Sequence, residues 1–107
     1  MSRWVAVTEA SSITEGCART IQVEHHALAV FNEAGTFYAT DDACPHQGAS
    51  LAEGVVMDGR VICPLHSWVF DLKTGACPRE SHEPVGCYPT RQTDDSVEVL
   101  LPTGEQS

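Results

Sequence analysis

The chain has 107 residues, of which 42% are apolar and 20% charged, which is typical of one globular domain and argues against a disordered chain. Fifteen acidic residues against six basic ones leave a formal net charge of −9, which argues against nucleic acid or an anionic membrane as a partner, because both require phosphate neutralisation. A protein partner with a basic face fits this charge better, and no apolar run approaches the roughly 20 residues that span a bilayer.

Strand-forming residues occur in short runs separated by Gly, Pro, Asn and Asp. Asn32-Glu33-Ala34-Gly35 and Asp58-Gly59 are turn signals, so we expect a hairpin around each. In chain order, strands are expected at 4–7, 19–23, 27–31, 36–39, 55–57, 60–63, 68–71, 86–88 and 96–100, with the last two joined through 93–95. This spacing predicts an all-β fold, a small β-sandwich or barrel, in a single domain over 1–101 followed by a flexible tail over 102–107.

One stretch, from Asp41 to Gly54, interrupts the succession of strands. It has loop composition, with a single helical turn expected at 50–53. A long loop in a small domain is usually functional, so we expect the site in this stretch.

The chain contains five cysteines but begins without the apolar stretch of a signal peptide, so we expect a cytoplasmic protein. An odd cysteine count in a reducing compartment argues against a disulfide scaffold and favours a metal site or catalysis. Two of the cysteines, Cys44 and Cys63, have a histidine close by, which makes a metal site the hypothesis to test.

The candidate ligands form two mixed pairs, Cys44-Pro45-His46 and Cys63-Pro64-Leu65-His66, with 16 residues between His46 and Cys63. The proline after each cysteine fixes φ and so partly pre-organises each loop. Gly48 and Gly54 allow the close backbone approach that such loops need.

Two metals compete for these four residues. Cys44, His46, Cys63 and His66 could hold one tetrahedral zinc in a zinc-stabilised interaction module, although zinc sites usually group the cysteines and the histidines separately. Mixed pairs suit a [2Fe–2S] cluster with two thiolates on one iron and two imidazoles on the other, so we favour the iron–sulfur cluster.

The two boxes resemble those of Rieske proteins, and the resemblance extends over 48–54 and 70–75, with most of the chain covered from about Thr14 to Leu101. Within that family the chain looks most like the small subunit of assimilatory NAD(P)H nitrite reductase, because of Cys-Pro-His in the first box, Trp68 after the second, and Gly86-Cys87-Tyr88-Pro89. Rieske ferredoxins of aromatic-ring-hydroxylating dioxygenases are the alternative.

The resemblance implies a cluster-binding part at about 41–80, one Rieske-type [2Fe–2S] cluster on Cys44, His46, Cys63 and His66, and one-electron transfer in nitrite assimilation or to a dioxygenase. The implied redox partner is a large siroheme flavoprotein subunit, or else a reductase and an oxygenase. The chain has no nucleotide-binding glycine loop and no obvious second redox site, so we expect it to bind no small-molecule substrate and not to be catalytic alone.

The resemblance also implies a low reduction potential. Ala49 and Leu65 stand where respiratory Rieske proteins have a disulfide, and Trp68 and Phe70 stand where those proteins have hydroxyl residues that donate to the cluster. Fewer hydrogen bonds to sulfur disfavour the added electron. We also expect the potential to be constant at low pH and to fall with pH once the histidines of the oxidised cluster lose their protons.

The remaining candidates have ordinary structural interpretations. We expect Cys17, Cys77 and Cys87 to be packing residues, since none has a histidine at ligand spacing. We expect His25 and His26 to be exposed in a turn, His82 to be solvated, and Trp68 and Phe70 to shield the cluster and pack in the core. Asp41 and Asp42 are either docking or capping residues, and Pro78 belongs either to a third cluster loop or to a simple turn.

Overall fold

A computed structural model describes residues 2–23, 26–43, 49–63, 69–73 and 86–102. Within these ranges the regular structure is ten strands and two short 3₁₀ turns, which confirms the predicted all-β class. The strands are β1 (Ser2–Glu9), β2 (Cys17–Val23), β3 (His26–Glu33), β4 (Thr36–Asp41), β5 (Val55–Met57), β6 (Arg60–Ile62), β7 (Val69–Asp71), β8 (Cys87–Tyr88), β9 (Thr90–Thr93) and β10 (Ser96–Pro102). The 3₁₀ turns are η1 (Ala10–Ser12) and η2 (Leu51–Glu53).

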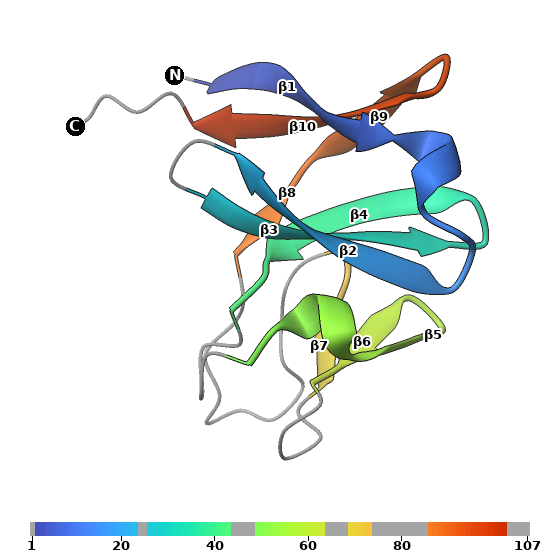
Figure 1. Cartoon of the computed structure of the whole chain (residues 1–107). Helices are drawn as coiled ribbons and strands as arrows, with labels where there is room; N and C mark the ends of the chain where they lie inside the picture. Colours follow the sequence, from blue (N-terminus) through green and yellow to red (C-terminus); the bar gives the residue numbers. More distant parts are fainter. Residues whose placement is uncertain (1, 24–25, 44–48, 64–68, 74–85, 103–107) are drawn as a thin grey trace.

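The strands form three antiparallel sheets, ordered β1-β10-β9, β2-β3-β4-β8 and β5-β6-β7. Figure 1 shows the four-stranded sheet in the middle, with β1 and β10 above it and β5-β6-β7 with η2 below it. The small lower sheet holds the strands on either side of the second predicted ligand box, so the expected site lies at that end of the molecule.

Both predicted hairpins are present. The β5–β6 turn places Asp58 at φ 53° and Gly59 at φ 76°, and the β3–β4 turn places Ala34 at φ 54° and Gly35 at φ 90°. Two successive positive φ angles mark the turn type that matches the twist of a hairpin, and Asp-Gly favours it strongly. The predicted helical turn near residue 50 is also confirmed, as η2.

The last part of the chain differs from the prediction. An additional strand, β9, lies between β8 and β10, and it pairs with β10 around the turn at Asp94. Its four residues, Thr-Arg-Gln-Thr, are mostly exposed and have no apolar alternation, because β9 is the edge of its sheet. β8 pairs with β4 of the four-stranded sheet and not with β10, and β10 extends to Pro102.

β3 explains how the core is organised, because its two faces belong to different clusters. Ala29 and Phe31 pack with Leu51, Val61, Cys63, Phe70 and Leu72, whereas Leu28 and Val30 pack with Ile13, Ala39, Val97, Val99 and Leu101. A strand covered on both faces is continuously apolar, as the sequence Ala-Leu-Ala-Val-Phe is. The first cluster therefore joins the four-stranded sheet to the small sheet and includes a predicted ligand, Cys63.

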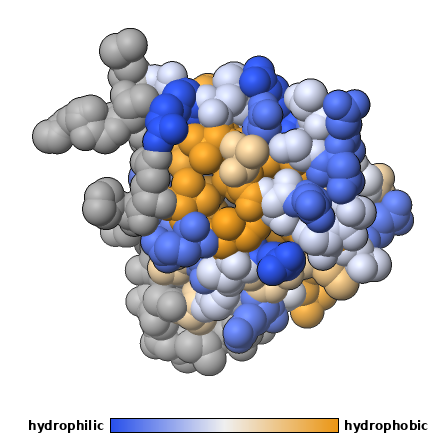
Figure 2. Space-filling view, turned by 45° about the horizontal axis from the view of Figure 1, so that its top comes forward, coloured by the Kyte–Doolittle hydropathy of each residue, from blue (hydrophilic) through white to orange (hydrophobic). Residues whose placement is uncertain are grey.

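The surface of the upper face carries apolar side chains near its centre, bordered by hydrophilic ones (Figure 2). Partly buried apolar residues of β1 and β2, such as Val5, Val7, Ile21 and Val23, pack against the edge of the second cluster. Among the described residues, no helix has the length and apolar character needed to cross a membrane.

Candidate metal centre

Of the four predicted ligands, the structure describes Cys63, whereas Cys44, His46 and His66 lie outside the described residues. Cys63 directly follows β6, and only 2% of its surface is exposed. It packs in the first core cluster with Leu51 and Phe70, so its thiol is held in a largely apolar environment at the end of the small sheet.

Each predicted ligand box lies between two residues whose backbones pair. Ala43 and Ser50 form an antiparallel bridge on either side of the first box. Ile62 and Val69 are partners in the β6–β7 ladder on either side of the second. Both boxes are therefore held at their bases by backbone pairing before any metal is considered.

Gly54 lies against Ile62, the last residue of β6 and the one directly before Cys63. A Cβ atom added to Gly54 would overlap the carbonyl oxygen of Ile62 and would lie 3.1 Å from its carbonyl carbon and 3.2 Å from the carbonyl oxygen of Leu51. Only glycine allows this approach between the segment after η2 and the residue before Cys63. The predicted close approach at Gly54 is thus confirmed, whereas Gly48 lies outside the described residues.

The aspartates before the first box have structural partners. Asp42 is buried, with 8% of its surface exposed, and its Oδ1 accepts hydrogen bonds from the Ser50 hydroxyl at 2.9 Å and the Ala52 amide at 3.1 Å. Asp41 Oδ1 accepts a hydrogen bond from the Tyr88 hydroxyl at 2.6 Å. Of the two interpretations left open for these residues, the capping role describes Asp42, which binds the backbone at η2.

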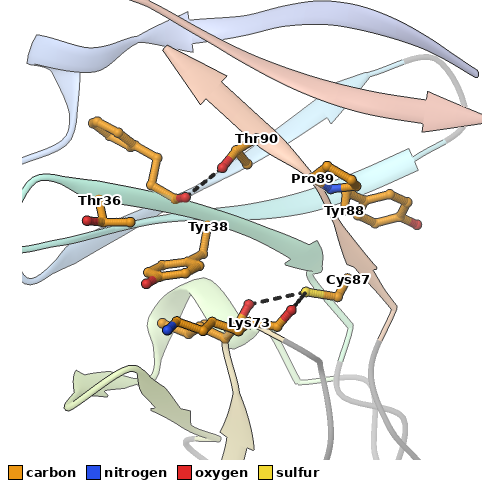
Figure 3. Close-up of a pocket in the computed structure, with 9 residues that line it drawn as sticks. Thr36, Tyr38, Lys73, Cys87, Tyr88, Pro89 and Thr90 are labelled. Carbon is orange, nitrogen blue, oxygen red and sulfur yellow. Dashed lines mark hydrogen bonds between the residues drawn. The ribbon is translucent and has the colours of Figure 1, made fainter.

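A cavity of about 540 Å³ lies between the four-stranded sheet and the residues after β7 (Figure 3). Its lining is mixed in chemistry and comprises Thr36, Phe37, Tyr38, Leu72, Lys73, Cys87, Tyr88, Pro89 and Thr90. The Cys87 thiol donates towards the carbonyl oxygens of Leu72 at 3.2 Å and Lys73 at 3.4 Å. These contacts link β8 to the two residues that follow β7.

The Cys87 thiol is not activated for nucleophilic chemistry. Burial and then the negative charge of Asp71 raise its pKa, against a smaller opposing effect of the Tyr88 amide. A reactive cysteine needs the opposite shift, because the thiolate is the nucleophile. Cys87 is half-buried, as a packing residue should be, and its sulfur contacts carbonyl groups.

Two of the remaining predictions are wrong. Cys17 is exposed, because it is the first residue of β2 and this strand is an edge of its sheet. His26 is not an exposed turn residue: it begins β3, is partly buried, and meets the Tyr88 ring edge-on with the ring centres 6.1 Å apart. Phe70 is fully buried and packs in the core as predicted.

The other residues singled out from the sequence, His25, Trp68, Cys77, Pro78 and His82, lie outside the described residues. Within the part of the chain that the structure describes, no group of three or more His, Cys, Asp or Glu residues could hold a metal ion. The described residues therefore offer no competing metal site.

Comparison with known proteins identifies the family. The family model of the Rieske [2Fe–2S] domain matches residues 3–89. The chain belongs to the Rieske [2Fe–2S] family. Its cofactor is accordingly a Rieske-type [2Fe–2S] cluster, and this family membership favours the iron–sulfur interpretation over a zinc module.

Relatives of two kinds are similar to this Rieske chain. The anthranilate 1,2-dioxygenase ferredoxin subunit of Burkholderia cepacia is 46% identical over 74 residues, covering 67% of this chain and 68% of that protein. The 3-phenylpropionate/cinnamic acid dioxygenase ferredoxin subunit of Escherichia coli K12 is 35% identical over 97 residues, covering 89% of this chain and 91% of that protein. A Mycobacterium tuberculosis structure assigned as an NADH-dependent nitrite reductase small subunit is 21% identical. Its TM-score is 0.88, and the match covers 97% of this chain and 99% of that chain.

The described residues fit a Rieske cluster. Cys63 offers a buried sulfur at a strand end, and iron–sulfur clusters are held by cysteine thiolates. Backbone pairing closes each box at its base, and Gly54 lets the segment after η2 lie against the residue before Cys63.

Proposed function

We propose that this chain transfers single electrons through a Rieske cluster held by Cys44, His46, Cys63 and His66. The cluster would supply a one-electron couple, and ligation by His46 and His66 would raise its potential relative to an all-cysteine cluster. The observation that carries the proposal is the pair of boxes, each containing one cysteine and one histidine and each flanked by paired backbones, in a chain of the Rieske family.

The roles of the chain's own residues follow from their positions. Cys63, buried at the end of β6, would supply one thiolate from a site that excludes water. Phe70 and Leu51 pack with Cys63 in the first hydrophobic core cluster and keep this side of the site apolar. Neither offers an O–H donor to a cluster sulfur, which supports a low reduction potential.

For the partner, we propose an aromatic-ring dioxygenase system, in which the chain acts as the ferredoxin between a reductase and an oxygenase. The dioxygenase ferredoxin subunits named above are 46% and 35% identical to this chain, whereas the nitrite reductase small subunit is 21% identical. This ordering reverses the preference that the sequence motifs indicated, because identity over 74 to 97 residues includes many more positions than those motifs do.

The second candidate is the small subunit of an NAD(P)H-dependent nitrite reductase, where the partner would be the large siroheme flavoprotein subunit. Its support is the TM-score of 0.88 over nearly both whole chains, together with the motif from Gly86 to Pro89. At 21% identity this likeness concerns the fold alone.

Stopped-flow mixing separates the two candidates. The reduced, cluster-containing protein is mixed either with the oxidised oxygenase of a ring-hydroxylating dioxygenase or with the large siroheme subunit, and cluster reoxidation is followed by absorbance. We expect reoxidation by the oxygenase, slowing with added salt because the chain carries a net charge of −9. Reoxidation by the siroheme subunit alone would overturn the dioxygenase assignment and favour nitrite reduction.

A further inference from the structure

Two neighbouring aspartates, Asp41 and Asp42, lie directly before the first ligand box and bind different parts of the fold. Successive residues of an extended chain point to opposite sides, so the two carboxylates can fix the chain from two directions. Neither is needed as a ligand in the proposed set, and the function proposed above leaves both unexplained.

Asp42 closes the base of the first box. Its Oδ1 accepts hydrogen bonds from the Ser50 hydroxyl and the Ala52 amide. Its own carbonyl oxygen accepts from the Leu51 amide at 2.7 Å, and its own amide donates to the Ala27 carbonyl at 2.9 Å. One residue thus joins β3, the end of β4 and η2, and it holds the two ends of the box together.

Asp41 fixes the same point relative to β8. Its carboxylate accepts from the Tyr88 hydroxyl, and its amide donates to the Gly86 carbonyl at 2.8 Å. A Cβ added to Gly86 would overlap this carboxylate, so the packing is tight. The chain before the first box is therefore fixed on both sides, and the Asp42 carboxylate cannot move far from its place.

Asp42 is buried, unlike the other acidic residues that the structure describes. Exposed carboxylates are screened by water and salt, whereas a buried one acts through a medium of lower polarity. Asp42 is 8% exposed and lies two residues before Cys44, a separation that spans at most about 7 Å of chain. Its negative charge would therefore oppose an additional electron near that cysteine.

We infer that Asp42 is a positioning residue of the cluster site, one that closes the first ligand loop by its hydrogen bonds and whose buried charge lowers the reduction potential. The inference rests on the proposed ligand set, because it requires Cys44 to bind the cluster. It predicts two separable effects of substituting Asp42. Loss of the charge should change the reduction potential, and loss of the hydrogen bonds should loosen the first ligand loop.

Asp42→Asn tests the charge. It keeps an oxygen acceptor for Ser50 and Ala52 but removes the negative charge, so the potential should rise. At a fixed redox poise the ratio of reduced to oxidised protein should increase several-fold, because removing a buried negative charge near the first box favours the added electron. The readout is a spectroscopic redox titration of the cluster-containing protein.

Two matched variants separate the buried charge of Asp42 from the loss of a surface charge and from the loss of a hydrogen bond. Asp94→Asn removes one charge from an exposed turn between β9 and β10, where Asn tolerates the φ of 55°, and its potential should not move measurably. Ser50→Ala removes a donor but keeps the Asp42 charge, so its potential should stay constant or fall.

Asp42→Ala tests the geometry. It removes the acceptor as well as the charge, so hydrogen exchange at the Ala52 amide should accelerate and the cluster content should drop, whereas Asp42→Asn should keep both. If this variant does not fold, the charge test still stands on Asp42→Asn.

An Asp42→Asn potential equal to that of the wild type, in protein with a full cluster, would overturn the inference while leaving the proposed function intact. Absence of labile sulfide from the wild type would overturn both.

Discussion

Gly54→Ala tests the close approach of the segment after η2 to the residue before Cys63. The added methyl group would overlap the Ile62 carbonyl oxygen and would lie 3.1 Å from its carbonyl carbon, both backbone atoms of a paired strand. Overpacking typically destabilises by about 1–3 kcal/mol, and we expect a value near 3 because backbone cannot rotate away as a side chain can. Residue 54 has φ of −81° and ψ of −176°, which alanine adopts freely, so the effect comes from the overlap alone.

For a chain of this length, a loss of about 3 kcal/mol corresponds to a decrease of roughly 12 °C in apparent Tm at a common scan rate. The strand that must move ends at Ile62, next to Cys63, so the iron content per chain should fall as well. Gly16→Ala is the control: nothing lies within 4 Å of its added methyl group, and its φ of +83° costs about 1–2 kcal/mol of backbone strain without affecting the site. Equal melting temperatures and equal iron contents for the two variants would refute the reasoning.

Three further predictions concern the site and its surroundings. Burial and the hydrogen bond to Asp41 raise the pKa of Tyr88 in the folded protein. The neutral phenol therefore contributes fully to the free energy of unfolding below the pKa of an unfolded tyrosine, about 10, and this contribution is lost as the pH rises above that value. The apparent Tm of the wild type should therefore fall more between pH 8 and pH 10.5 than that of Tyr88→Phe, and parallel curves would contradict this. The reduction potential should lie towards the low end of the Rieske range of about −150 to +300 mV and should decrease only at alkaline pH, whereas a titration giving a value in the upper half would contradict the argument from the missing hydroxyl groups at Trp68 and Phe70. His66→Cys should lower the potential towards about −400 mV if the cluster is retained, with His26→Ala as the non-ligand control, and an unchanged spectrum and potential would show that His66 is not a ligand.

The parts of the fold that local chemistry determines could be predicted from the sequence. Asp58-Gly59 specifies its hairpin because both residues accept positive φ. The continuous apolar run in β3 indicated a strand, although its burial between two clusters becomes evident only in the structure. The ligand boxes were recognisable because residue type and spacing are themselves the chemical requirement.

Features that depend on distant partners could not be predicted in this way. β9 has an exposed polar sequence, and only its pairing with β10 makes it a strand. The partners of Asp41 and Asp42 are 47 and 8 to 10 residues away, and no local pattern indicates them. His26 looked like a turn residue because the ring that it meets, Tyr88, lies on a strand far along the chain.

The most direct test of the proposed cluster is pulsed EPR of the reduced protein, with iron and acid-labile sulfide determined on the same sample. We expect two irons and two sulfides per chain, with hyperfine coupling to the nitrogens of two histidine ligands. A single metal ion without labile sulfide, or a cluster without nitrogen coupling, would contradict the proposal.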